Sequence, residues 1–168
     1  MPSLTISIIV VLVVIALLVI GRLMKRRPSV ERLKIDDLDE HMQQLAEEAV
    51  DISKGYNLAL DYTINSIEKA EVVLGKIHED FIKQNPKEGV DGLAMAFGAY
   101  IGETIKRNSS GAHWEQDHPV GGPNSFPLHW EGGESFTPAW CYRRITIGPE
   151  DNVWHKYQVL AEQRNTTN

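Results

Sequence analysis

The feature that most constrains this chain is an uncharged apolar run that starts at Leu4. The run reads LTISIIVVLVVIALLVIG, covers 18 residues to Gly21, and consists mainly of Ile, Val and Leu. A helix needs about 20 predominantly apolar residues to cross the bilayer core, and insertion of these side chains is favourable. Because a helix in a soluble core normally keeps a polar face, we predict a transmembrane helix within residues 4–23.

Four cations follow this run and predict its orientation. A cleaved signal peptide, the alternative, would need a positively charged N-terminus, a shorter apolar stretch and a small-residue cleavage site. The opening sequence MPSLTIS has no charged side chain, and no A-x-A pattern follows the run. Basic residues beside a span stay cytoplasmic, so we predict an uncleaved anchor with its N-terminus outside and the rest of the chain in the cytoplasm. The flanking cations are Arg22, Lys25, Arg26 and Arg27.

The remainder of the chain is acidic. The sequence has 17 Lys and Arg against 23 Asp and Glu, and residues 1–27 hold four of the cations and none of the anions. Residues 28–168 therefore have 13 basic and 23 acidic side chains, a net charge of −10. Such a charge disfavours nucleic acid, whose binding needs a cationic surface, and suits a basic protein partner.

Two amphipathic helices are predicted after a short connection. The first begins at Asp37, where Glu40 three residues later resembles a capping box. Its apolar residues recur at spacings of three and four, as on one face of a helix. Gly55 ends it, and the second helix ends before Pro86. The apolar positions of the first are Leu38, Met42, Leu45, Ala49 and Ile52.

A third helix is predicted within residues 89–108 and is of a different kind. Its sequence, GVDGLAMAFGAYIGETIKRN, is apolar on nearly all sides. Gly98 and Gly102 are four residues apart, a spacing that lets a neighbouring backbone come close. A glycine inside a helix costs up to about 1 kcal/mol relative to alanine. We therefore predict that close packing offsets this cost and that the helix lies at the centre of the core.

The chain beyond Asn108 favours strands. Residues 112–116, 125–131 and 139–147 are rich in aromatic and β-branched side chains and are separated by Gly and Pro clusters. A last helix is predicted from Pro149. The predicted fold class is α+β, with an N-terminal transmembrane helix, about three helices, a small antiparallel sheet of about three strands and a C-terminal helix. The predicted parts are an anchor at 1–27, a connecting amphipathic helix at 28–57, a cytoplasmic domain at 58–163 and a frayed tail at 164–168.

The segment HWEQDHPVGGPNSFPLHW, residues 113–130, has the densest group of polar and aromatic side chains. Neighbours in a strand point to opposite faces, so Trp114 and Trp130 are predicted to face the core, with His113 and His129 outside. No zinc-ligand spacing is present, and no metal or cofactor is predicted. Aromatic residues are favoured at interface hot spots. The predicted partner-binding residues are therefore His113, His118, His129 and Trp130.

Other polar residues allow further interpretations. The single Cys141 forms no internal disulfide, and its apolar surroundings in the sequence favour a small buried residue over a nucleophile. Glu103 lies on the apolar helix, where a carboxylate needs a partner, so we predict an ion pair with Arg143 or Arg144. The alternative to a binding protein is an enzyme or metal-binding protein with a pocket lined by His113, Asp117, His118, His129 and Glu103.

Three stretches resemble a known family. They are LDYTINSIEKAEVVL at 60–74, GAYIGETIKRN at 98–108 with Gly111 and Trp114, and RRITIGPEDNVWHKY at 143–157. Together they resemble a family of small bacterial α+β domains of uncharacterised function, found alone or beside secretion and toxin loci. The resemblance covers roughly residues 58–160. It implies a bacterial source and a compact domain, and it implies no catalytic residues.

These observations favour a non-enzymatic, membrane-anchored interaction protein of the bacterial inner membrane. The resemblance adds a narrower expectation, an immunity-like or secretion-accessory role, which rests on analogy of fold. The expected partners are the lipid bilayer, through residues 4–23, and a basic protein. Nucleic acid is not expected as a partner.

Overall fold

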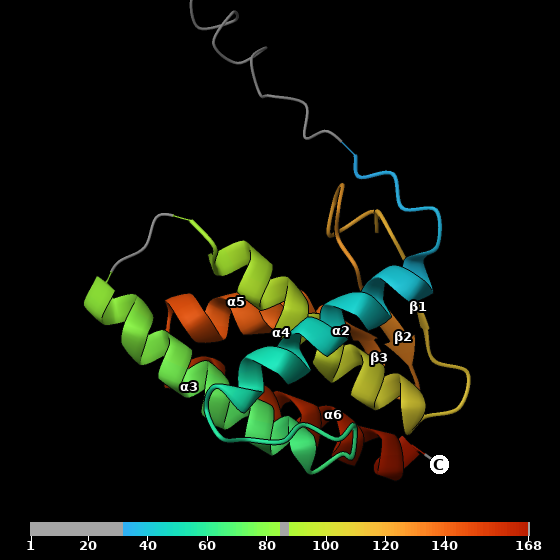
Figure 1. The fold of residues 1–168 in the computed structure, drawn as a ribbon. Coiled ribbons are helices and arrows are strands. Elements are labelled where there is room, and N and C mark those ends of the chain that lie inside the picture. The colour runs from blue at the N-terminus through green and yellow to red at the C-terminus, as the bar shows by residue number, and fades with distance from the viewer. Residues whose placement is uncertain (1–31, 85–87, 168) are drawn as a thin grey trace, which may run out of the picture. The chain divides into compact units, whose positions relative to one another are not determined.

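The computed structural model describes residues 32–84 and 88–167. The helices α2 (Leu38–Lys54), α3 (Ser66–Gln84) and α4 (Val90–Arg107) come first, three strands follow, and α5 (Thr137–Thr146), the 3-10 turn η1 (Pro149–Asp151) and α6 (Val153–Thr167) come last (Figure 1). The last helix begins after η1 rather than at Pro149, and it continues to Thr167. It therefore extends into residues predicted to form a frayed tail.

The helix α4 lies at the centre of the core, with α2 and α5 packed against it. Its two spaced glycines lie where those contacts are tightest. A Cβ atom at Gly98 would come within 2.4 Å of the backbone of Pro138 in α5, and one at Gly102 would come within 2.1 Å of the Trp114 ring. The prediction that close packing explains these glycines is confirmed.

The helix α2 belongs to the same core. Asp37 caps its N-terminus, because its Oδ1 accepts a hydrogen bond from the Glu40 backbone N–H at 3.0 Å. Met42, Ala46 and Ala49 are fully buried. The segment predicted to be a connecting amphipathic helix therefore packs its apolar face into the core of the domain.

The sheet is small and antiparallel, in the order β1 (His113–Trp114), β2 (Leu128–Trp130), β3 (Gly133–Ser135). His113 pairs with His129 across β1 and β2, and His129 pairs with Glu134 across β2 and β3. Trp114, Leu128 and Trp130 are buried, whereas His113 is exposed and His129 is half-buried. The predicted alternation, tryptophans inward and histidines outward, is confirmed.

The strand predicted at residues 139–147 is wrong, because residues 139–146 belong to the helix α5 and Ile147 caps it. Cys141, Arg144 and Ile145 are buried, whereas Tyr142 and Arg143 between them are exposed, a pattern of helical period. Pro138 lies in the first turn, where a proline fits a helix. The third strand is instead β3, in one of the glycine-rich stretches predicted to separate strands.

The transmembrane helix in the predicted fold class also needs correction. No helix within residues 32–84 and 88–167 is long and apolar enough to cross a membrane. The apolar run at 4–23 and its flanking cations lie outside the described residues, and the location and orientation inferred from them stay predictions. The architecture that the structure describes is α+β, made of helices and one small antiparallel sheet.

Asp151 joins η1 to α5 and α6 through two ion pairs. Its Oδ1 accepts hydrogen bonds from Arg143 Nε at 2.9 Å and Lys156 Nζ at 2.6 Å, and these two bonds hold the pKa of the Asp151 carboxyl below its usual value. A carboxyl whose pKa is lowered by folding stabilises the fold above its unfolded pKa of about 4, and this stabilisation is lost as the pH falls through the folded value.

We therefore expect Asp151→Asn to lower the free energy of unfolding at neutral pH. We also expect the variant to lose less stability than the wild type as the pH falls below about 4. Urea unfolding followed by circular dichroism at several pH values measures both effects. A variant with the acid profile of the wild type would contradict this role for Asp151.

Candidate functional site

The histidines of the sheet come together on its outer side. The register places His113 on β1 opposite His129 on β2, and their rings stack with centroids 5.1 Å apart and planes at 15°. His118 reaches the same place from the loop after β1, with its ring centroid 6.3 Å from that of His129 and 5.5 Å from that of Phe136. The three imidazoles therefore meet on the outer side of the sheet.

The loop between β1 and β2 holds His118 through its own hydrogen bonds. The His118 backbone N–H donates to Ser125 Oγ at 3.0 Å, and its carbonyl accepts from the Gly122 N–H at 2.7 Å. Asp117 adopts a left-handed φ of 62°, and its Oδ1 accepts from the Asn124 N–H at 2.7 Å. His118 is therefore positioned by a bonded loop.

Two glutamates complete the cluster. Glu115 Oε2 lies 2.6 Å from His129 Nε2, and the carboxylate of Glu134 lies 3.3 Å from His118 Nε2 and 3.8 Å from His129 Nδ1. The side chains of Glu115 and Glu134 keep 40% and 43% of their surface exposed, so both can reach a molecule in solution. We call this set the histidine face: His113, Glu115, His118, His129 and Glu134.

Trp130 does not belong to this face. It is 8% exposed, its Nε1–H donates to Ser135 Oγ at 2.9 Å, and its ring stacks on Tyr157 with centroids 5.9 Å apart. The prediction that Trp130 contacts a partner therefore needs correction. It lies on the opposite side of β2 from His129 and supports the sheet from within the core.

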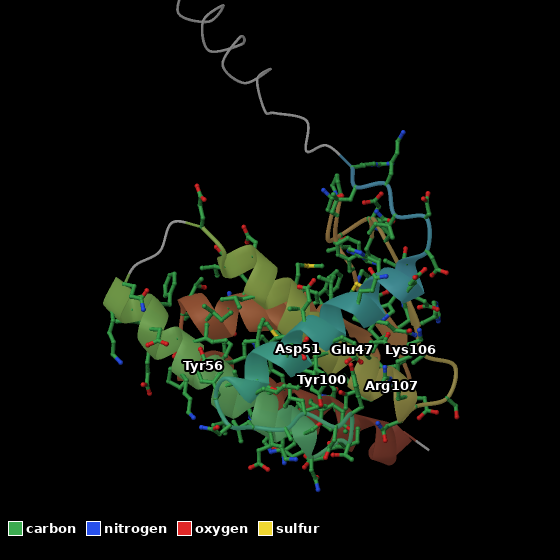
Figure 2. The ribbon with its side chains drawn as sticks, in the orientation of Figure 1. Glu47, Asp51, Tyr56, Tyr100, Lys106 and Arg107 are labelled. Carbon is green, nitrogen blue, oxygen red and sulfur yellow. The ribbon has the colours of Figure 1, made fainter. Side chains whose placement is uncertain are left out.

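Glu103 has other partners than the predicted arginines. Its Oε1 accepts a hydrogen bond from Trp114 Nε1 at 2.8 Å, and Lys106 and Arg107, labelled in Figure 2, lie 3.7 Å from its carboxylate. Arg144 instead pairs with Glu71 at 2.6 Å, and Arg143 pairs with Asp151. The predicted pairing is wrong, because the arginines of α5 pair with Glu71 on α3 and with Asp151 on η1.

The other predicted ligands lie apart from one another. Asp117 forms a hydrogen bond within its loop and an ion pair with Arg32 at 3.7 Å, and Glu103 is buried and bonded to Trp114. Within the described part of the chain, no group of three or more His, Cys, Asp or Glu residues is arranged to hold a metal ion. The polar contacts within the histidine face are those between its imidazoles and the carboxylates of Glu115 and Glu134.

Cys141 is fully buried on α5, and burial raises the pKa of its thiol far above the usual range. Because the thiolate is the reactive form of cysteine, we expect no reaction with a thiol reagent such as Ellman's reagent while the protein is folded. We expect complete reaction of one thiol in urea. Rapid labelling of the folded protein would contradict the buried position of Cys141.

Three glutamates with important contacts were absent from the predictions: two on the histidine face and one in the core. Glu115 could have been found, because it lies two residues after His113 and strand alternation places both on one face. Glu134 required knowledge of β3. Glu71, which binds Arg144, lies in an amphipathic helix with many other charged residues, and nothing in the local sequence distinguishes it from them.

Comparisons with family models, with characterised proteins and with solved structures found no significant match for this chain.

Proposed function

We propose that the domain binds a protein partner without catalysis and that the histidine face is its docking surface. The convergence of three imidazoles and two carboxylates on the open side of the sheet supports this proposal. The core does not require these groups, since the sheet packs inward through Trp114, Leu128 and Trp130. Side chains already held by neighbours lose little conformational freedom on binding, which favours affinity.

The expected partner presents Lys or Arg to this face. Glu115 and Glu134 offer partly exposed carboxylate oxygens, and hydrogen bonds between cations and carboxylates are stronger than neutral ones. The net charge of residues 28–168 would speed association with such a partner. An immunity-like or secretion-accessory role is the narrower form of the proposal, and the family resemblance of residues 58–160 is its support.

A catalytic use of the same side chains is the second candidate, and one contact favours it. The bond between Glu115 and His129 is of the kind that orients an imidazole as a general base. However, the other ring nitrogen of His129 faces Glu134 at 3.8 Å, so neither nitrogen is directed at an open substrate position. This geometry favours binding over catalysis.

Site-specific photo-crosslinking in cells tests the proposal. The full chain would contain a photoreactive amino acid at His113, on the histidine face, or at Gln158, which is exposed on α6. We expect one discrete crosslinked protein from position 113 and none of that size from position 158. No product from position 113, or the same product from both positions, would contradict docking at the histidine face.

A further inference from the structure

An apolar cleft lies away from the sheet, between the C-terminal half of α3 and the first turns of α4. Its volume is about 240 Å³. In Figure 1 this end of α3 and the sheet lie at opposite sides of the helices, so the cleft is separate from the histidine face. The apolar residues that line it are Ile77, Phe81, Val90, Leu93 and Ile145.

The size of the cleft limits what can fill it. Sites for drug-sized ligands occupy about 300–1,000 Å³, more than this cleft offers. A single large apolar side chain of a partner, inserted as an anchor, suits the smaller space.

The rim of the cleft is acidic. Asp80 and Glu88 contribute to its lining, and among the described residues neither carboxylate has an ion-pair partner. Tyr56, labelled in Figure 2, completes the rim, and its burial and the nearby Asp80 raise the pKa of its phenol. Lys76 Nζ lies 5.7 Å from the centroid of the Tyr56 ring.

We propose that this cleft binds a basic segment of a protein partner, with one apolar side chain inserted between α3 and α4 and flanking Lys or Arg residues paired with Asp80 and Glu88. The apolar lining recognises the anchor, and the two carboxylates select for cations and against acidic segments. This site is additional to the histidine face and does not depend on it.

A labelled synthetic pentapeptide, one leucine between two pairs of lysines, tests the proposal by fluorescence anisotropy with the full chain. Two matched control peptides are used. In one the leucine is replaced by alanine, and in the other the lysines are replaced by glutamates. The double variant Asp80→Asn with Glu88→Gln removes the rim charges. The control, Glu79→Gln with Asp91→Asn, removes the same charge from exposed neighbours that do not line the cleft.

We expect saturable binding of the leucine–lysine peptide to the wild type and to the control variant. The rim variant is expected to bind about three- to tenfold more weakly, since two exposed ion pairs are lost, and the other two peptides are expected to bind more weakly to the wild type. Equal affinity of rim and control variants, equal affinity of the three peptides, or no saturable binding would overturn the proposal.

A variant of the histidine face, Glu115→Gln with Glu134→Gln, separates this proposal from the previous one. We expect it to bind the leucine–lysine peptide with unchanged affinity. Loss of peptide binding in this variant would place the peptide at the histidine face and would overturn the assignment to the cleft.

Discussion

Replacement of Glu71 by alanine is expected to lower the free energy of unfolding by about 3–5 kcal/mol, the usual cost of removing one partner of a buried ion pair. Glu71 Oε1 accepts a hydrogen bond from Arg144 Nε at 2.6 Å, and its Oε2 accepts one from the Val153 N–H at 2.9 Å. The carboxylate therefore joins α3 to α5 and to the start of α6. Glu71 and Arg144 are 8% and 6% exposed, so the variant would leave a guanidinium buried without its anion.

Urea unfolding followed by circular dichroism measures this effect, and two further variants define its cause. Glu79→Ala removes an exposed glutamate from the same helix and is expected to change stability by no more than about 0.5 kcal/mol. Glu71→Leu combined with Arg144→Met is expected to recover most of the loss, because apolar side chains can replace a buried pair. Equal stability of Glu71→Ala and Glu79→Ala would contradict a role for the pair.

Gly98→Ala is expected to destabilise the domain by about 1–3 kcal/mol or more, the range for overpacking of a core. The added methyl group would lie 2.4 Å from the N and Cα atoms of Pro138. These are backbone atoms, so no side-chain rotation relieves the clash, and α5 must move away from α4. That movement would also lengthen the hydrogen bond from Thr137 Oγ1 to the Gly98 carbonyl, now 2.7 Å.

Gly92→Ala provides the matched control on the same helix. A Cβ atom at Gly92 meets nothing within 4 Å, and alanine is favoured over glycine inside a helix by up to about 1 kcal/mol. The same substitution is therefore expected to raise the thermal midpoint at position 92 and to lower it at position 98. Shifts in the same direction at both positions would contradict the close contact between α4 and α5.

Local sequence patterns correctly predicted the elements that are determined by residues close together in the sequence. Apolar spacing identified α2, with Asp37 as its cap, and strand alternation placed Trp114 inside and His113 outside. The pattern failed at residues 139–147, where aromatic and β-branched side chains favour strand. There the packing against other elements favours a helix instead. Cys141, Arg144 and Ile145 are buried, and Arg144 pairs with Glu71 on α3.

The candidate site was predicted in part for the same reason. His113 and His129 follow from alternation within their own strands, but their stacking depends on the register between β1 and β2. The partners of Glu103 were missed because the structure supplies the indole N–H of Trp114 and two cations of the same helix, Lys106 and Arg107, in place of the arginines of α5. Arg144 could be matched to Glu71, 73 residues away in sequence, only once α3 and α5 were placed side by side.

The affinity of the full chain for the partner captured at position 113 tests the docking proposal most directly. Glu115→Gln with Glu134→Gln keeps the shape of the histidine face and removes its charge. We expect this variant to bind at least about tenfold more weakly, as is common when one side of an interfacial ion pair is lost. Glu48→Gln with Glu68→Gln removes the same charge from exposed positions on α2 and α3 and is expected to bind like the wild type. Equal affinities of the two double variants would contradict docking at the histidine face.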